Sequence, residues 1–337
     1  MTIRPNWSGP VRARGRLVAV LALSAGLVLA GGLAARAGWD AVATVLSRLS
    51  VEGLAAVCLV QVGAIVGCAT AWRTVLPGGS LPALVGSRAI RDGVSSVLAI
   101  LPGLGEAAGI RALAVFGTPP APATASGLVD LAAEILSQAL FTMIGVVALL
   151  ALSGGAEAGR GTAILAAAAV PTVAFVALLG TAPGHALLVR LLARLGQAGA
   201  PVAGELGQEV AAEIGRLVGQ RRRVAACTLL HLAAWFLSAV QIWVAALALD
   251  HPLSGTAALA LAAMAHAVRG VFFVVPWGAG VQEAGFVVAG AMVGMDEPTA
   301  FAISLVTRAR DLVLGLPALG LWAFVEARAA ATNVRGA

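Results

Sequence analysis

Charged residues are scarce in this sequence, and lysine is absent. Only 11% of the 337 residues are charged and 60% are hydrophobic, whereas soluble globular chains have about 25% charged and roughly 45–50% apolar residues. A chain of this composition cannot cover itself with a water-soluble surface. We therefore predict an all-α integral membrane protein that forms a single membrane domain over residues 1–337.

All 22 basic residues are arginines, and the net charge is +6. A positive charge can indicate nucleic-acid binding, but these arginines lie in short loops between apolar runs, where they determine topology instead. Placing both termini in the cytoplasm leaves only Arg36, Arg48 and Arg160 in the outer segments. We therefore expect no nucleic-acid partner, and a multi-pass membrane protein with cytoplasmic N- and C-termini.

Residues typical of metal and catalytic sites are also few. Cys58, Cys68 and Cys227 are scattered in apolar stretches, without a CxxC pair or a histidine spacing suited to zinc. His231 and His266 each stand alone and are expected to be packed side chains. The sequence has no HExxH, GxSxG or phosphate-binding loop. We expect no metal, no cofactor and no enzymatic activity, so any driving energy would come from a gradient or from the lipid pool.

Long apolar runs are the main feature of the sequence. The first follows several arginines, as in a signal peptide, but it is long enough to span a bilayer, and we expect an uncleaved helix. The loop 183–224 is the sizeable soluble piece; it is expected to be cytoplasmic and to contain a surface helix. The predicted spans are 17–35, 51–71, 122–152, 162–182, 225–249 and 298–327.

Two further apolar regions are interrupted midway by proline and glycine. The first breaks at "LPGLGE" (101–106) and the second at "VPWGAGVQE" (275–283). Proline and glycine end a helix, and lipid does not tolerate exposed non-helical backbone. Each region is therefore interpreted as a re-entrant hairpin, with two full spans joined by a surface turn as the alternative, giving six spans plus two hairpins or eight spans. The break residues are Pro102, Gly103, Gly105, Pro276, Gly278 and Gly280.

The two breaks are related by spacing. Glu106 and Glu283 are each followed by a glycine eleven residues later, and an acid stands seventeen residues after that glycine, Glu134 in the first half and Asp311 in the second. Three spans per half is an odd number, so the halves would form an inverted repeat, an arrangement found in many secondary transporters. The halves are residues 1–160, with the hairpin at 93–117, and residues 161–337, with the hairpin at 257–294.

Ionisable residues inside apolar segments cluster around the breaks, and such residues are candidate functional groups. We expect the arginines to bind a polar headgroup and the acids to balance that charge or to carry a coupling proton. The candidates are Arg91, Glu106, Arg111, Asp130, Glu134, Arg269, Glu283, Arg308, Arg310 and Asp311.

These candidates also have purely structural interpretations. Asp130 and Glu134 are spaced by four and share a helical face with Gln138, so they face the interior. They either line a substrate or proton pathway, or pair with Arg91, Arg111 or the Arg308 and Arg310 set as neutralised packing. Glu106 and Glu283 could be simple N-terminal caps that complement the helix dipole. The arginines of the last span, with Asp311, could be interfacial anchors, although facing guanidinium groups suit a phosphate.

The segments "LPGLGEAAGIRAL" and "VPWGAGVQEAGFVVAGAMVGMDEPTAFAISLVTRARDLVLGLPAL" resemble the lysylphosphatidylglycerol synthase transmembrane region, a flippase-like family. In the first half, "AWR" (71–73), "RAIRD" (88–92) and "VDLAAEILSQ" (129–138) look most like the branch associated with bacterial hopanoid biosynthesis. The resemblance covers residues 54–323. Full-length lysyl transferases of this family carry a soluble catalytic domain after the membrane part, and no such domain precedes Ala337, so the resemblance implies flippase-like activity without aminoacyl transfer.

The resemblance implies a lipid flippase or lipid-transport protein that moves a polar-headgroup or hopanoid-type lipid across the inner membrane. Its partners would be anionic phospholipid, aminoacyl-lipid or hopanoid, and possible protein partners are enzymes of lipid biosynthesis. Two alternatives stay open. One is a membrane-embedded lipid-modifying enzyme that uses Asp130 and Glu134 with His266 as acid and base, and the other is a non-transporting scaffold of a lipid-synthesis complex.

Overall fold

The computed structural model describes residues 24, 28–98, 103–152, 205–271, 275 and 278–335, and this part of the chain is helical. Pro102, Pro276 and the predicted span 162–182 lie outside the described residues, as does most of the predicted span 17–35. The helices are Val28–Ala37, α2 (Trp39–Leu46), α3 (Val51–Val75), α4 (Leu81–Gly93), the π-helical turn η1 (Val94–Leu98), α5 (Leu104–Val115), α6 (Pro120–Leu152), α9 (Glu205–Gly219), α10 (Arg221–Ala248), α11 (Gly255–Val271), α12 (Val281–Met292) and α13 (Glu297–Arg335).

Four of the described helices are long and apolar enough to cross a membrane, and they confirm the prediction of an all-α membrane protein. They are Val51–Val75, Pro120–Leu152, Arg221–Ala248 and Glu297–Ala330. These helices coincide with the predicted runs 51–71, 122–152, 225–249 and 298–327. Apolar run length therefore located all four, because about twenty apolar residues are needed to cross a bilayer.

The first break separates two antiparallel helical limbs. The first limb is α4 continued by η1, and the second is α5, which begins after Gly103 in a left-handed conformation (φ +83°). Gly105 and Gly109 of α5 lie directly on the first limb. A Cβ atom on Gly105 would lie 2.5 Å from the backbone oxygen of Arg91, and one on Gly109 would lie 2.8 Å from Arg91 Cβ. Close packing of the limbs therefore requires glycine at both positions.

The second break has the same construction. α11 and α12 pack against one another, with Gly285 at 3.4 Å from Val268 and Gly278 at 3.7 Å from Arg269, distances measured from the position that a Cβ atom would occupy. Gly278 and Gly280 both have positive φ. α5 and α12 have 12 residues each. Because a helix rises 1.5 Å per residue, each spans about 18 Å, which is short of the roughly 30 Å hydrocarbon core.

The helices follow the same order twice. A long helix, a two-limbed hairpin and a second long helix occur as α3 to α6 and again as α10 to α13. Glycines with positive φ precede and follow the short limb in both sets: Gly103 and Gly117 in the first, Gly280 and Gly294 in the second. Gly103 and Gly280 are separated by 177 residues, as are Gly117 and Gly294, and this is also the separation of Glu106 and Glu283. Backbone conformation therefore follows the spacing found in the sequence.

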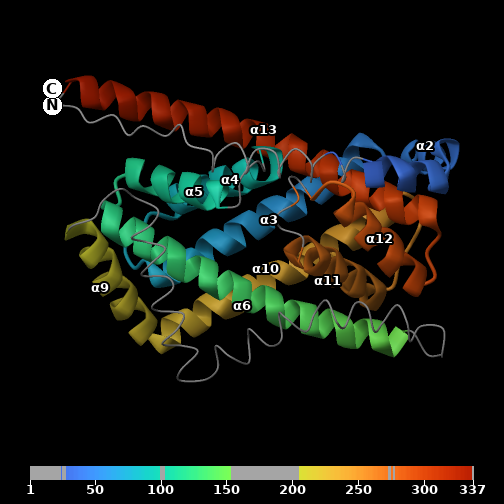
Figure 1. Ribbon diagram of the computed structural model, residues 1–337, viewed down its shortest axis with the longest axis horizontal. Coiled ribbons are helices and arrows are strands. Elements are labelled where there is room, and N and C mark those ends of the chain that lie inside the picture. Colours follow the sequence, from blue (N-terminus) through green and yellow to red (C-terminus); the bar gives the residue numbers. More distant parts are fainter. Residues whose placement is uncertain are drawn as a thin grey trace.

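The first helices of the two sets, α3 and α10, pack side by side in antiparallel directions along their length. Gly53, near the start of α3, meets Ala248 at the end of α10, and Gly67 meets Ala234 further along, with Cβ positions 3.6 Å apart in the second pair. Small residues let membrane helices approach closely. In Figure 1, α4 and α5 lie towards the end of the bundle that carries α9, whereas α11 and α12 lie towards the end that carries α2.

α9 is the surface helix expected in the loop 183–224. Its apolar residues Val210, Ile214 and Leu217 are buried against the end of α6, while Glu213 and Arg216 form an exposed ion pair. The arginines from Arg221 onward begin α10 rather than ending α9. α9 therefore covers one end of the bundle and supports the part of α6 that carries Asp130 and Glu134.

Candidate functional site

Charged side chains gather in two clusters among the helices. The first charge cluster lies between α4, α5, α6 and α10, and the second lies between α11, α12 and α13. The first charge cluster consists of Arg88, Arg91, Asp92, Glu106, Asp130, Glu134 and His231. The second charge cluster consists of Arg269, Glu283, Arg308, Arg310 and Asp311.

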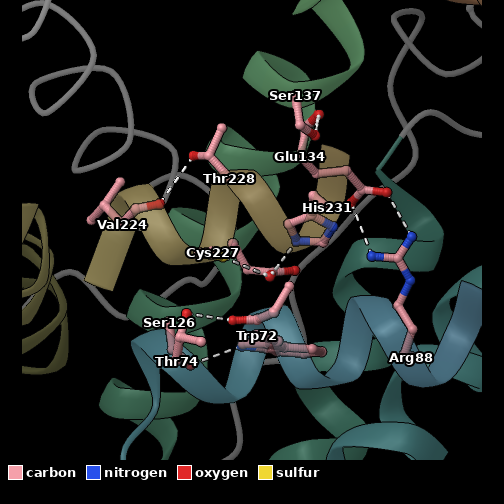
Figure 2. Close-up of polar contacts among 12 residues, drawn as sticks. Trp72, Thr74, Arg88, Ser126, Glu134, Ser137, Val224, Cys227, Thr228 and His231 are labelled. Atoms are coloured by element: carbon pink, nitrogen blue, oxygen red, sulfur yellow. Dashed lines mark hydrogen bonds and ion pairs between the residues drawn. The ribbon is translucent and has the colours of Figure 1, made fainter. Parts of the chain in front are cut away.

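Glu134 is the centre of the first charge cluster. Both of its carboxylate oxygens accept from Arg88, NH1 to Oε2 at 3.0 Å and NH2 to Oε1 at 2.6 Å, and Figure 2 shows this two-point pair. Arg91 NH2 donates to Oε2 at 2.6 Å. The two arginines stand three residues apart on α4, so they lie on one face of that helix and reach the same carboxylate.

Asp130 lies one helical turn before Glu134 and joins α6 to α10. Its Oδ2 is 3.4 Å from Arg91 NH1, and its Oδ1 is 2.7 Å from His231 Nε2. The Cys227 thiol, one turn before His231 on α10, lies 3.5 Å from the same Oδ1. The side chains of Asp130 and His231 are both 0% exposed, so the pair has no direct contact with solvent.

The other two acids lie at the edge of the cluster. Asp92 Oδ1 is 2.9 Å from Arg88 Nε, and Glu106 Oε1 is 3.5 Å from Arg91 NH2. Each of the two acidic side chains is 28% exposed. The cluster therefore opens outward at Asp92 and Glu106. Its four carboxylates exceed its two arginines by two negative charges when His231 is neutral.

The second charge cluster is built around the second break. Arg308 Nε donates to Glu283 Oε1 at 3.0 Å, and Arg308 NH2 donates to the backbone oxygen of Gly278 at 3.1 Å. Arg308 thus ties the last long helix, α13, both to the short limb and to the glycine turn before it. Because the guanidinium group is planar and has several donors, one arginine can hold both partners.

Arg310 lies on another side of α13 and leads to the centre of the bundle. Its NH2 is 2.6 Å from Asp311 Oδ1, and its NH1 donates to Gln241 Oε1 of α10. Gln241 Nε2 in turn donates to Gln61 Oε1 of α3 at 2.7 Å. This chain of hydrogen bonds connects the second charge cluster to the antiparallel contact between α3 and α10.

Arg269, on the last turn of α11, is partly exposed and close to Gly278. It forms no hydrogen bond or ion pair with any residue that the structure describes. Asp311 and Asp92 attract it electrostatically, while Arg308 and Arg310 repel it. Three arginines face two carboxylates in this cluster, so it carries an excess of one positive charge, opposite in sign to the first charge cluster.

The polar face of α6 runs from the first charge cluster to the end of α11. Gln138 Nε2 donates to the backbone oxygen of His266 at 3.3 Å. The neighbouring Ser137 Oγ accepts from Trp235 Nε1 at 3.1 Å, and the Trp235 ring lies edge-on to the His266 ring, with centroids 4.8 Å apart. Gln138 thus links the helix that carries Asp130 and Glu134 of the first charge cluster to α11, the helix that carries Arg269 of the second.

Nine of the ten residues singled out from the sequence lie in the two charge clusters, and Arg111 does not. Arg111 points outward from α5 and pairs with Glu326 of α13 at 3.1 Å, with 55% of its side chain exposed. The break glycines Gly103, Gly105, Gly278 and Gly280 lie where the hairpin limbs meet. The predicted pairing of the α6 acids with Arg91 is observed, and the pairings with Arg111, Arg308 and Arg310 are not.

Sequence reasoning did not select Arg88 and His231 as site residues. Arg88 repeats the signal that identified Arg91, an arginine on the same face three residues earlier. His231 is buried, as expected, but it is hydrogen-bonded to Asp130. His231 could have been identified from the sequence by its position within an apolar span, where an ionisable group is costly unless it has a partner.

Two groups of side chains could offer ligand atoms to a metal ion, and both include His231. In each of the two groups, one with Cys68 and Glu134 and the other with Asp130 and Cys227, the ligand atoms lie within 4.8 Å of one another. The carboxylates are already bonded to Arg91, and Glu134 is also bonded to Arg88. Because these guanidinium charges repel a cation, we assign no metal to either group.

Comparisons with known proteins give one match. Neither the curated proteins nor the solved structures contain a match to this chain. The family model described as the lysylphosphatidylglycerol synthase TM region matches residues 17–318, which include the described parts of both charge clusters and both breaks. The match spans most of the chain, and the protein therefore belongs to the lysylphosphatidylglycerol synthase transmembrane-region family.

Proposed function

We propose that this protein moves a lipid with a polar headgroup, either a phosphate-bearing lipid or a hopanoid-type lipid, across the bacterial inner membrane. The family links this membrane protein to lipid handling. The observation that carries the proposal is Arg269, a partly exposed arginine beside the second break that has no bonded partner among the described residues.

Arginines in membrane segments are rare and usually have a partner, because an unpaired charge is costly there. Arg269 lies next to Arg308 at the Gly278 turn, and the second charge cluster has an excess of one positive charge. A phosphate or another anionic headgroup would supply the missing negative charge. The guanidinium group of Arg269 offers planar donors of the kind that bind phosphate oxygens.

The paired helix sets supply the movement in this proposal. Antiparallel packing of α3 and α10, and the positions of the two hairpins towards opposite ends of the bundle, support an inverted repeat in which the hairpins enter the membrane from opposite sides. Inverted repeats with broken helices near the bilayer midplane permit alternating access to a shared site. The headgroup would pass between the hairpins while its apolar chains stay in the bilayer.

A lipid-translocation assay tests the proposal. The purified protein is reconstituted into vesicles with headgroup-labelled phospholipid or a hopanoid, and the labelled lipid that reaches the other leaflet is measured. We expect movement with the wild type and about a tenfold decrease with Arg269→Gln, which removes one charged contact. Arg36→Gln, which breaks an exposed ion pair with Glu297, is the control. A folded wild type that moves no lipid would contradict the proposal.

Side-specific labelling tests the inverted arrangement separately. The three native cysteines are replaced, and Ala107→Cys or Ala284→Cys, at equivalent positions on the two short limbs, is then labelled with a membrane-impermeant thiol reagent. We expect the two positions to react from opposite sides of the membrane. Labelling of both from the same side would exclude an inverted pair of hairpins.

One observation favours a second candidate function, a membrane-embedded lipid-modifying enzyme. Asp130 and His231 form a hydrogen-bonded acid and base, and the Cys227 thiol lies 3.5 Å from the same carboxylate oxygen. The partner of Asp130 is thus His231, whereas the sequence had suggested His266. Mass spectrometry of lipids from cells that express the wild type or Asp130→Asn tests this candidate. A lipid product that depends on Asp130 would favour the enzyme.

A further inference from the structure

The Asp130–His231 pair has no role in the headgroup site around Arg269. Both side chains are 0% exposed, and Asp130 Oδ1 lies 2.7 Å from His231 Nε2. The pair lies within the cluster whose acids outnumber its arginines by two. Asp92 and Glu106, at the edge of the cluster, are 28% exposed, while the buried Asp130 and Glu134 balance Arg88 and Arg91. The excess therefore acts from the edge of the cluster, and unneutralised charge is costly at membrane depth, so this cluster has a reason to bind positive charge.

A proton on His231 would reduce this imbalance with the least rearrangement. The imidazole is already hydrogen-bonded to Asp130, and protonation makes both ring nitrogens donors, so a cationic imidazole would face an anionic carboxylate at hydrogen-bond distance. One proton changes the net charge of the first charge cluster from −2 to −1. A second proton, on one of the carboxylates, would make the cluster neutral.

The groups around His231 favour the protonated form. Asp130 and Glu134 face it from α6, Cys227 lies one turn earlier on its own helix, and Cys68 approaches it from α3. The positive charges on α4 and α13 oppose protonation of His231, but they do not contact it directly. Arg88 and Arg91 of α4 reach the region through the two carboxylates, and Arg310 of α13 meets α10 at Gln241, ten residues after His231.

Arg91 connects this pair to the outside of the cluster. It contacts three carboxylates, Glu134 at 2.6 Å, Asp130 at 3.4 Å and Glu106 at 3.5 Å. Glu106 is partly exposed and stands at the start of the short limb α5. Movement of that limb would change how many carboxylates Arg91 neutralises, and with it the charge around His231.

We infer that the Asp130–His231 pair is a proton-binding site that couples lipid movement to proton movement. His231 takes the proton on Nδ1, which has no hydrogen-bond partner among the described residues, and releases it when movement of the α5 limb changes the contacts that Arg91 makes with the carboxylates. The coupling rests on the proposed lipid transport. The existence of the proton site does not, and the two parts are tested by different measurements.

Nitrogen NMR of the full-length protein in lipid nanodiscs tests the proton site without any transport. The chain has four histidines, which are labelled with ¹⁵N on the ring. We expect one signal, absent in His231→Gln and present in His251→Gln, to change from imidazolium to neutral imidazole between about pH 5 and 9. Asp130→Asn should move this transition to lower pH. A His231 signal that does not change over that range, whether neutral or protonated, overturns the assignment.

Transport under a pH gradient tests the coupling. With one proton per lipid, a difference of one pH unit would drive accumulation of the lipid in one leaflet up to about tenfold. We expect this accumulation in the wild type and in His251→Gln, and its loss in His231→Gln and after addition of a proton ionophore. Lipid movement that does not depend on the pH gradient would overturn the coupling but not the proton site. A wild type that moves no lipid overturns the transport function, and the NMR measurement then decides the proton site by itself.

Discussion

Arg88 and Glu134 form a two-point ion pair, with both carboxylate oxygens bonded to guanidinium nitrogens at 3.0 and 2.6 Å. The pair joins α4 to α6 across 46 residues of sequence and is mostly buried, with 7% and 12% of the two side chains exposed. It therefore fixes the first limb of the hairpin against a membrane-spanning helix.

Replacing Glu134 by glutamine should destabilise the protein strongly. The change keeps the shape but replaces the carboxylate that Arg88 and Arg91 share by a neutral amide, and breaking a buried pair in this way costs about 3 kcal/mol or more. Thermal unfolding in detergent, followed by the fluorescence of the seven tryptophans, measures the loss. Arg36→Gln breaks an exposed pair with Glu297 and should cost less than about 1 kcal/mol. Equal losses in the two variants would contradict this expectation.

Arg308→Lys should lower lipid movement without unfolding the protein. Lysine keeps the charge, but its single ammonium group cannot hold Glu283 and the Gly278 backbone oxygen with the geometry of a planar guanidinium. Loss of one charge-assisted hydrogen bond corresponds to about a tenfold slower rate. The vesicle translocation assay measures it, with the exposed Arg216→Lys of α9 as the matched control. An unchanged rate in Arg308→Lys would remove Arg308 from the site.

Arg111→Gln should leave lipid translocation within about twofold of the wild type, because an exposed ion pair contributes little. Arg111 pairs with Glu326 on the outer side of α5, away from both charge clusters. The same vesicle assay measures the rate. A large loss of translocation would show that Arg111 contacts the lipid, as the sequence analysis predicted when it placed this residue among the headgroup-binding candidates.

Gly105→Ala should loosen the first hairpin. The added methyl group would lie 2.5 Å from the backbone oxygen of Arg91, which cannot rotate away, and overpacking of this kind costs about 1–3 kcal/mol. Thermal unfolding measures the loss. Gly320→Ala on α13 is the control, because a Cβ atom there meets nothing within 4 Å. A Gly105→Ala protein as stable as the control would mean that the limbs are not packed as described.

The long helices could be predicted from the sequence because hydrocarbon thickness sets a minimum length for an apolar run. The repeat could also be predicted in outline, since the same spacing carries Gly103 and Gly280 into corresponding turns with positive φ. The start of the first hairpin is harder to predict from the sequence. Its first limb begins at Leu81, within a stretch that carries Arg88 and Arg91, and a hydropathy pattern does not reveal a charged helix that is later covered by acids.

The α6 half of the candidate site was predictable because Asp130 and Glu134 share a helical face by local spacing alone. Their partners depend on which helices meet, and Asp130 and its partner His231 are 101 residues apart. The direction in which the Arg111 side chain leaves its helix explains why it lies outside both charge clusters. It follows Glu106 by five residues, which is a rotation of about 140° at 100° per residue, so the two side chains leave α5 on nearly opposite faces. Counting this rotation along the sequence would have shown that Glu106 and Arg111 do not face the same site.

The dependence of α4 on α6 also constrains how the protein is made. Ribosomes synthesise Arg88 and Arg91 more than 35 residues before Asp130 and Glu134, and each arginine alone opposes insertion into the bilayer by about 2.5–3.5 kcal/mol. We therefore expect the first hairpin to enter the bilayer together with α6, not ahead of it. In that order of events, α4 and α5 would stay at the membrane surface until the acids that neutralise the arginines of α4 have been synthesised.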